Sequence, residues 1–296
     1  MIRTAQSEFA TLAEVVLKHP REAFVSRDAI ASQWRALNFT APPDLEAAIG
    51  EYDRFVEILQ EHGALVRFLP ASPGLDSIYV RDASVACDRG VVLCRMGKRL
   101  RAEEPGLQEA ALRSINHPIL GRIAAPATLE GGDVVWLDRR SVAVGRGYRT
   151  SDEGIAQLHA LLAGSVDEFI VVPLPHWRGP TDVFHLMSII SPVDRDLAVV
   201  YSPLMPVAFR EALLARGIAL VEVPDEEFDT MGANVLTIAP RRCVMVRGNR
   251  VTRARLERAG AEVIEYEGRE ISLKGGGGPT CLTRPLVRLD SADDLC

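Results

Sequence analysis

A cysteine near the end of the chain lies at a position that favours nucleophilic chemistry. Cys281 closes the stretch "GGGGPTC", which runs from residue 275 to 281. Glycine loses more backbone freedom on folding than any other residue, so four in a row indicate a backbone that is fitted closely against something. Such a turn can aim the sulfur into a cleft where backbone N–H groups lower the pKa of the thiol. The alternative is an inert, buried cysteine, which is the usual state of a free thiol.

A cysteine nucleophile needs a base and later an acid, and His185 is the candidate. It begins the apolar run in "FHLMSII", where an imidazole must find a buried partner, although a satisfied core histidine is the commoner case. Glu130, the first residue of "EGGD", is the candidate for a third, acidic member. Asp133 in the same motif is interpreted as a turn carboxylate that caps local N–H groups.

Two further acidic residues and two arginines have spacings that favour ligand binding. Asp76 and Asp82 flank "SIYVR" and lie on the same side of an extended strand, where carboxylates are costly unless they meet a cation or a donor. Arg101 and Arg149 follow strand-like runs at corresponding places, and together they could form a fork for a carboxylate. A solvated charge is the alternative for either arginine.

These residues recur at similar places because the chain repeats a pattern of two strands followed by a helix. Such units begin near residues 76, 130, 184 and 232. A fifth begins in the glycine stretch and takes its helix from residues 44–63 near the start of the chain. We therefore expect one α/β domain spanning residues 1–296, a five-fold propeller of ββαβ units whose inner ends converge. A three-layer α/β fold without repeats is the alternative.

The composition of the chain limits the classes of function that the protein can have. The 296 residues are 47% hydrophobic and carry a net charge of −6, which argues against nucleic-acid or anionic-membrane partners. No apolar run has the length of a membrane span and no signal-like N-terminus is present, so we expect a cytoplasmic protein. The five cysteines are scattered and the histidines form no ligand pair, so no metal or other cofactor is expected.

The motifs "DSIYVRD", "EGGD", "VGRGYRTSDEG", "FHLMS" and "GGGGPTC" occur in an order that resembles the guanidino-group-modifying superfamily of pentein fold. The resemblance implies that Cys281 is the nucleophile, His185 the general acid and base, and Glu130 the carboxylate that orients His185. It also implies a small guanidino substrate, whose guanidinium would be held by acidic residues (Asp76 and Asp82) and whose amino-acid carboxylate would be held by arginines (Arg101 and Arg149). A homodimer is the assembly considered.

Within this superfamily the sequence is most like dimethylarginine dimethylaminohydrolase. Met187 stands two residues after His185, where arginine deiminases and amidinotransferases typically carry an aspartate, and an apolar side chain there could accommodate an N-alkyl group. The expected reaction is hydrolysis of Nω-methylated arginine through a covalent cysteine adduct. Two features differ from that pattern, since Arg81 replaces a common glutamate and "GGGGPTCLTRPL" is more typical of arginine deiminases.

Three alternatives therefore remain. An arginine deiminase-like hydrolase acting on arginine is the first, and an amidinotransferase is the second. The third is a non-catalytic anion-binding module built on the glycine stretch, which does not follow the Walker pattern because Lys274 precedes the glycines. Asn234 lies where the fourth unit approaches the hub, and no role is assigned to it.

Overall fold

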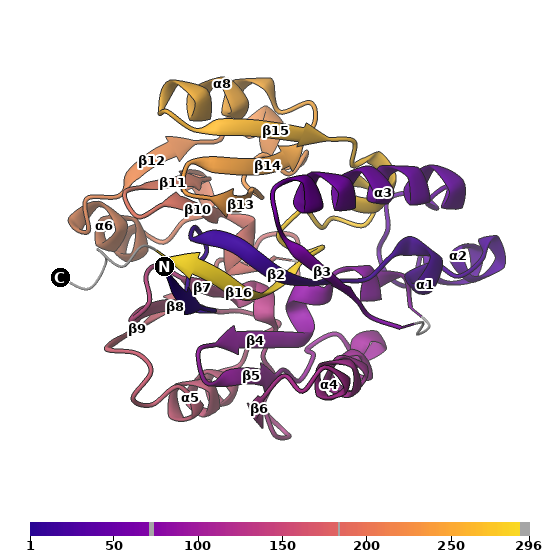
Figure 1. Cartoon of the computed structure of the whole chain (residues 1–296), viewed down its shortest axis with the longest axis horizontal. Coiled ribbons are helices and arrows are strands. Elements are labelled where there is room, and N and C mark those ends of the chain that lie inside the picture. Colours follow the sequence, from indigo (N-terminus) through magenta and orange to yellow (C-terminus); the bar gives the residue numbers. More distant parts are fainter. Residues whose placement is uncertain (71–73, 183, 291–296) are drawn as a thin grey trace.

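Five small β-sheets make up the computed structural model, which describes residues 1–70, 74–182 and 184–290 (Figure 1). Four sheets have three strands each and the fifth has four. In each three-stranded sheet the first two strands form an antiparallel hairpin, and the third lies parallel to the second. The prediction of a five-fold α/β propeller of ββαβ units is confirmed, and the three-layer alternative is wrong.

The three-stranded units follow one another along the chain, and each has a helix between its second and third strands. The first comprises β4 (Ser84–Cys87), β5 (Gly90–Leu93), α4 (Glu104–Ser114) and β6 (Ile119–Arg122). The second comprises β7 (Val134–Trp136), β8 (Ser141–Arg146), α5 (Asp152–Leu161) and β9 (Glu168–Pro173). The third comprises β10 (Ile190–Asp194), β11 (Leu197–Val200), α6 (Val207–Ala215) and β12 (Ala219–Glu222). The fourth comprises β13 (Leu236–Ala239), β14 (Arg242–Val246), α8 (Arg250–Arg258) and β15 (Glu262–Tyr266).

The fifth sheet joins the two ends of the chain. Its strand order is β1 (Ile2–Thr4), β16 (Arg284–Asp290), β2 (Thr11–Leu17) and β3 (Leu65–Phe68). The last strand is antiparallel to both β1 and β2, while β3 lies parallel to β2 after the long helix α3 (Leu45–Glu61). Three short helices complete the fold, namely α1 (Pro20–Ala23), α2 (Arg27–Gln33) and α7 (Asp225–Phe228).

Local sequence explains where the longer helices begin. The side chain of Asp44 accepts a hydrogen bond from the N–H of Ala47 (2.9 Å) and so caps α3. Ser151 caps α5 in the same way through the N–H of Gly154 (3.2 Å). Gly154 has a second function, because a Cβ there would lie 2.0 Å from the carbonyl oxygen of Thr128.

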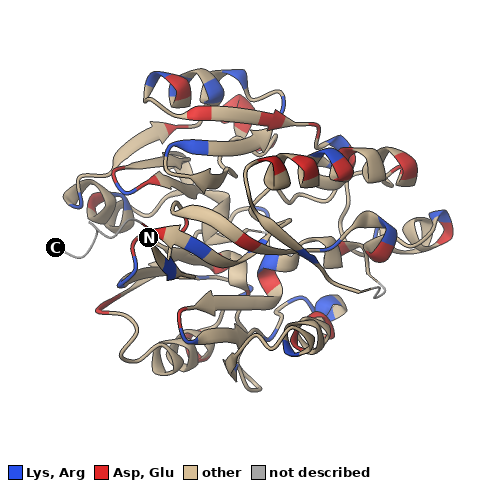
Figure 2. Ribbon diagram, viewed as in Figure 1, with Lys and Arg blue, Asp and Glu red and all other residues tan. Residues whose placement is uncertain are grey.

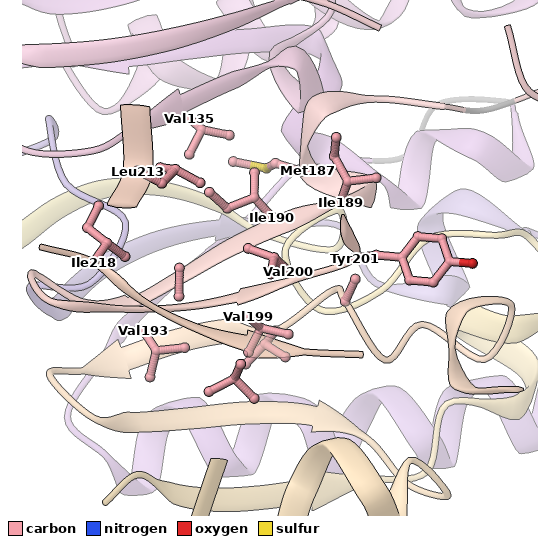
Figure 3. Close-up of a cluster of buried hydrophobic side chains, with 14 of the residues drawn as sticks. Val135, Met187, Ile189, Ile190, Val193, Val199, Val200, Tyr201, Leu213 and Ile218 are labelled. Atoms are coloured by element: carbon pink, nitrogen blue, oxygen red, sulfur yellow. The ribbon is translucent and has the colours of Figure 1, made fainter. Parts of the chain in front are cut away.

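Apolar side chains fill the space between neighbouring units. Figure 3 shows one such cluster, in which residues of the third unit such as Ile190, Val199 and Leu213 pack together with Val135 of the second. Each sheet is too small to bury both of its faces alone, so these shared clusters hold the units together. Acidic and basic residues both occur along the outer helices α3 and α8 (Figure 2). None of the helices in the described ranges combines the length and apolarity of a membrane span.

Short 3₁₀ segments lead into the first strands of three units. Two of them, Leu75–Ile78 and Val80–Ala83, precede β4, and Gly131–Asp133 precedes β7. A fourth, Leu186–Ser188, precedes β10. The segment before β7 contacts both the segment before β4 and the segment before β10, although the three are distant in sequence. Side chains at these positions are therefore brought to one place by the propeller.

Candidate active site

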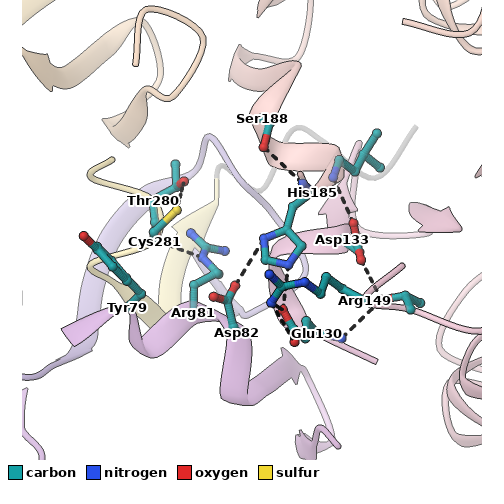
Figure 4. A network of polar contacts seen from close by, with 12 residues as sticks. Tyr79, Arg81, Asp82, Glu130, Asp133, Arg149, His185, Ser188, Thr280 and Cys281 are labelled. Atoms are coloured by element: carbon teal, nitrogen blue, oxygen red, sulfur yellow. Dashed lines mark hydrogen bonds and ion pairs between the residues drawn. The ribbon is translucent and has the colours of Figure 1, made fainter. Parts of the chain in front are cut away.

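The same position in each of the five units contributes a polar side chain to one region of the molecule. Asp82, Glu130, His185, Asn234 and Cys281 each lie two to five residues before the first strand of their unit. Figure 4 shows the cysteine, the histidine and the two carboxylates gathered in one region, with Arg81 and Arg149 beside them. The network therefore depends on closure of the whole ring.

The glycine run is required by close packing against neighbouring side chains. A Cβ on Gly275 would lie 2.0 Å from the hydroxyl of Tyr79, and one on Gly277 would lie 2.4 Å from the same ring. A Cβ on Gly278 would lie 2.4 Å from Oδ1 of Asn234. Gly276 differs, because it has open space but a φ of +75°, which side chains rarely adopt. Each of these four positions thus requires glycine for its own physical reason.

Cys281 is held by its backbone and by two polar neighbours. Its carbonyl oxygen accepts from the N–H of Arg81 (3.2 Å), and its Sγ lies 3.6 Å from Nδ2 of Asn234 and 3.9 Å from Oγ1 of Thr280. Burial and the charge of Asp82 raise the pKa of the Cys281 thiol to about 11. A backbone hydrogen bond from Gly278 lowers the thiol pKa, as the glycine turn predicts, but burial and Asp82 exceed this effect, so the thiol is not activated in the free protein.

His185 and Glu130 form a direct buried pair. Nε2 of the imidazole lies 2.8 Å from Oε2 of Glu130, and both side chains are inaccessible or nearly so, with exposed fractions of 3% and 0%. Oε1 of Glu130 accepts from the backbone N–H groups of Gly97 (2.9 Å) and Lys98 (3.1 Å). Burial opposes ionisation, but the contact with His185 lowers the pKa of Glu130. The carboxylate therefore fixes the ring and stays ionised.

Two other carboxylates surround the imidazole. Oδ1 of Asp82 lies 3.7 Å from Nδ1 of His185, and Asp133 accepts from the N–H of Leu186 (3.0 Å) and the hydroxyl of Thr150 (2.6 Å). Burial lowers the pKa of His185, but Asp82, Asp133 and Glu130 together raise it to about 9. The imidazole is therefore protonated at neutral pH.

Asp133 is a residue that the sequence interpretation missed. It was expected to cap local N–H groups, but its partner Leu186 is 53 residues away in the next unit. Burial raises the pKa of Asp133 to about 6. Gly132 beside it permits this approach, since a Cβ there would lie 2.5 Å from Nδ1 of His185. The signal in the sequence that could have identified Asp133 as a site residue is its place in the motif "EGGD".

Asp76 is paired with a lysine that sequence reasoning did not single out. Nζ of Lys98 lies 2.6 Å from Oδ2 of Asp76 and 2.8 Å from the carbonyl oxygen of Leu37. Asp76 is buried, with an exposed fraction of 5%. A cation thus already occupies the carboxylate that was expected to meet a substrate guanidinium.

The two arginines have contacts that differ from those of a substrate-carboxylate fork. Arg101 donates to Oδ2 of Asp82 (2.6 Å), to Glu104 (2.8 and 2.9 Å) and to the carbonyl oxygen of Tyr79 (2.9 Å). Arg149 lies within 3.5 Å of both oxygens of Glu130 and donates to the carbonyl oxygen of Asp182 (3.2 Å). Both are buried, so in this structure they hold carboxylates of the protein.

Cys281 and His185 line one cavity of about 320 Å³. Met187 also lines it, and much of the remaining wall is apolar or aromatic, formed by Leu37, Trp177, Phe184, Phe228, Met231 and Leu273. Charged side chains of Arg178, Asp182, Asp229 and Lys274 border the same cavity. None of these charged residues is a predicted site residue, because they reach the cavity only through the packing of segments that are distant in sequence.

The polar cluster could also present ligand atoms to a metal ion. One donor atom each from Asp82, Glu130 and His185 can be chosen so that all lie within 4.8 Å of one another. However, an arginine guanidinium already contacts the carboxylate of both Asp82 and Glu130. The donor set therefore fits a charge-balanced network better than a cation site.

The other cysteines that the structure describes are buried. Burial raises the pKa of Cys87, and it raises that of Cys94 and Cys243 more strongly. These three thiols are inert core groups, as their apolar sequence context predicts. Cys296 lies outside the described residues.

Comparison with known proteins agrees with this geometry. Residues 26–288 match the family model described as N,N dimethylarginine dimethylhydrolase, eukaryotic. The chain is 29% identical to the uncharacterized protein YkgA of Bacillus subtilis (strain 168), with 96% of this chain and 94% of the relative covered. It is 30% identical to the N(G),N(G)-dimethylarginine dimethylaminohydrolase of Streptomyces coelicolor, with coverage of 82% and 87%.

A solved structure has the same fold. The dimethylarginine dimethylaminohydrolase (DDAH) of Pseudomonas aeruginosa, complexed with citrulline, superimposes with a TM-score of 0.74 at 23% identity and covers 92% of this chain and 98% of its own. The chain belongs to the N,N dimethylarginine dimethylhydrolase family of the guanidino-group-modifying superfamily, and it is a hydrolase that acts on C–N bonds of guanidino compounds.

Proposed function

We propose that the protein hydrolyses Nω-methylated arginine to citrulline and methylamine or dimethylamine, with Cys281 as the nucleophile. The observation that carries the proposal is that Cys281 and His185, from units almost 100 residues apart, line one cavity together with Met187. An uncharged, adaptable side chain beside the imidazole suits an N-methyl group. The relative from Streptomyces coelicolor bears the name of this activity.

Asp82 is the residue best placed to receive the substrate guanidinium. Its Oδ1 is buried and has no hydrogen-bond partner in the part of the chain that the structure describes, whereas Oδ2 is bound by Arg101. A buried oxygen without a partner is costly, and a guanidinium N–H would satisfy it. We assign to Arg101 and Arg149 the positioning of Asp82 and Glu130. Asp76 contacts the guanidinium in this proposal only if Lys98 moves.

The substrate itself activates the nucleophile. In the free protein the Cys281 thiol holds its proton at neutral pH, because its pKa lies near 11. A bound guanidinium places a positive charge beside the sulfur and stabilises the thiolate, whose proton leaves to solvent. The thiolate then attacks the central carbon of the guanidinium.

The departing amine takes its proton from His185. Nε2 of the imidazolium is engaged by Glu130, so Nδ1 is the atom that transfers the proton. The C–N bond to the methylated nitrogen breaks and leaves an S-alkylthiouronium on Cys281. His185, now neutral, takes a proton from water, and the resulting hydroxide adds to the carbon. The Cys281 thiolate then departs while the added hydroxyl gives its proton to solvent, which leaves the neutral ureido product.

Turnover of four guanidino compounds tests the proposal. Purified protein is incubated with asymmetric dimethylarginine, monomethylarginine, arginine and agmatine, and ureido product and released amine are measured for each. Equal amounts of citrulline and methylated amine from the methylated arginines are expected. Citrulline from arginine alone would instead support the arginine deiminase-like alternative.

Intact-mass measurement after rapid acid quenching tests the covalent step. An adduct on Cys281 is expected with wild-type protein and none with Cys281→Ser, which should keep its fold and lose turnover. Turnover retained by Cys281→Ser would exclude the nucleophile assignment. Transfer of the amidino group to an added amine in place of water would identify an amidinotransferase.

A further inference from the structure

Three buried arginines form one cluster beside the turn that carries Cys281. Arg81, Arg284 and Arg288 have exposed fractions of 1%, 4% and 0%, and we call them the arginine cluster. Arg81 donates from Nε to the carbonyl oxygen of Thr280 (3.1 Å), and Figure 4 shows it next to this turn. Arg284 donates from Nη2 to the carbonyl oxygen of Arg81 (2.6 Å). Backbone contacts thus fix these side chains in the interior.

Several donors of the arginine cluster are left without an acceptor. Four buried nitrogen atoms have no hydrogen-bond partner in the described ranges, namely Nη2 of Arg81, Nε of Arg284, and Nε and Nη2 of Arg288. Nη1 of Arg288, in contrast, donates to two backbone carbonyl oxygens, at 2.5 and 2.8 Å. A buried N–H group without an acceptor costs free energy, and a guanidinium can only donate. The four atoms therefore favour an acceptor from outside the described polypeptide.

The charges of the cluster are not balanced either. Glu8 lies 3.3 Å from Nη1 of Arg81, and among the described carboxylates it alone forms an ion pair with one of the three arginines. The pKa of Arg284 falls to about 9 and that of Arg288 to about 10, because burial and the charge of Arg81 outweigh Glu8. Asp82 also acts on Arg284, but its own ion pair is with another arginine. Because arginines keep their protons in proteins, three positive charges face one negative charge.

A small cavity lies next to the arginine cluster. Its volume is about 10 Å³, and its lining includes Glu8, Thr237 and Thr280, which accept hydrogen bonds from Arg81 and Arg288. This is room for about one water-sized species. A water molecule would accept hydrogen bonds but leave the charge unchanged, whereas a small anion would do both.

We propose that the arginine cluster binds a small monovalent anion such as chloride among the guanidinium groups of Arg81, Arg284 and Arg288. The anion accepts from the unpartnered N–H groups and offsets one of the two excess positive charges. It also steadies the guanidinium of Arg81, which supports the turn before Cys281. None of the three arginines is among the described residues that line the cavity of Cys281 and His185, so the anion site is separate from the substrate site.

Urea denaturation at constant ionic strength tests the proposal. Sodium bromide is exchanged stepwise for sodium gluconate, whose anion is too large for the site. Because bromide binds the folded state, the equilibrium constant for unfolding should fall about tenfold for each tenfold rise in bromide above its Kd. An equilibrium constant that does not fall as bromide replaces gluconate would overturn the proposal.

Two variants separate this site from general effects of salt. Arg288→Gln removes one charge and two of the four unpartnered nitrogen atoms, so it should lose most of the bromide dependence. Arg67→Gln is the matched control, because Arg67 lies in the same sheet and forms a partly exposed pair with Glu14 (3.0 Å). It should keep the wild-type dependence. Equal dependence in the two variants would show that bromide acts elsewhere, against the proposal.

Anomalous X-ray scattering from wild-type crystals grown in sodium bromide locates the anion without any variant. A bromine peak is expected within hydrogen-bond distance of Nη2 of Arg81 and Nη2 of Arg288. Ordered density at that place without an anomalous signal would identify water and overturn the proposal. Bromine peaks at the surface with none at the arginine cluster would indicate an adventitious ion only, and would overturn it as well.

Discussion

His185 owes its proton affinity to three carboxylates that the fold places around one buried ring. Glu130 contacts Nε2, Asp82 lies near Nδ1, and Asp133 holds the backbone N–H of the next residue. These charges outweigh the burial that would otherwise keep the imidazole neutral, and the pKa of His185 rises to about 9. An acid for the leaving amine is therefore available throughout the neutral range.

Glu130→Gln tests this dependence. The amide keeps the size of the carboxylate and an acceptor for Gly97 and Lys98, but it removes the charge beside Nε2. The pKa of His185 should fall from about 9 toward 6.5. Turnover at neutral pH should fall by about 10²-fold or more, as for loss of a general acid. An NMR titration of the imidazole measures the first effect, with the exposed Asp167→Asn as the control.

Cys281 provides a prediction about pH. Burial and Asp82 raise its thiol pKa to about 11, so the thiolate fraction of the free protein should grow about tenfold per pH unit through neutral and mildly alkaline pH. The rate of alkylation by iodoacetamide should rise in parallel. Asp82→Asn should lower the thiol pKa and increase the rate at pH 7.

The labelled residue is identified by peptide mass spectrometry. The three buried cysteines (Cys87, Cys94 and Cys243) serve as internal references that should stay unlabelled. A rate that reaches its plateau near pH 7 in the free protein would show that the thiol is activated without substrate, against this prediction.

The glycine run shows how one loop controls the nucleophile. Asn234 Oδ1 accepts from the N–H (3.0 Å) and the hydroxyl (2.9 Å) of Thr280, while its Nδ2 lies 3.6 Å from the sulfur of Cys281. Because a Cβ on Gly278 would lie 2.4 Å from that same Oδ1, the loop and Asn234 can fit only with glycine at this position. Asn234, which had no predicted role, thus positions the turn that carries Cys281.

Gly278→Ala and Gly276→Ala should therefore have different effects. The first displaces Asn234 and with it Cys281, so turnover should fall at least about tenfold, since small misplacements of reacting groups are costly. The second meets no neighbouring atom and only strains a left-handed backbone, so it should cost about 1–2 kcal/mol of stability and retain turnover. Steady-state kinetics and urea denaturation measure both. Equal losses of turnover would contradict the proposed difference.

Features encoded in short stretches could be predicted from the sequence, whereas partners from other units could not. Ser151 caps α5 through neighbouring atoms, the glycine turn marks Cys281, and the start of an apolar run marks His185. Asp133 was misread because its partner Leu186 belongs to another unit. For Arg101, the sequence placed the residue at a strand exit but could not indicate that Asp82 and Glu104 bind its guanidinium.

A cluster of buried arginines lies beside the turn that carries Cys281. Arg81, Arg284 and Arg288 have exposed fractions of 1%, 4% and 0%, and come from the first unit and the last strand. Arg81, which replaces the glutamate common in dimethylargininases, donates to the carbonyl oxygen of Thr280 (3.1 Å) and to Glu8 (3.3 Å). Burial and Arg81 lower the pKa of Arg284, while Glu8 has the opposite effect. Glu8 is therefore the counter-charge that this cluster depends on.

Glu8→Gln should destabilise the molecule as a whole. Removing one partner of a buried ion pair leaves the other charge uncompensated, which costs about 3–5 kcal/mol. Glu8 lies between β1 and β2, so its contact with Arg81 also connects the closing sheet to the first unit. Urea denaturation should show a large fall in the free energy of unfolding, with tryptophan fluorescence and activity lost together. Glu14→Gln is the matched control, because its pair with Arg67 is partly exposed and should contribute less than about 1 kcal/mol. Similar small losses in both variants would show that the arginine cluster is balanced without Glu8, and that closure of the ring does not depend on this contact.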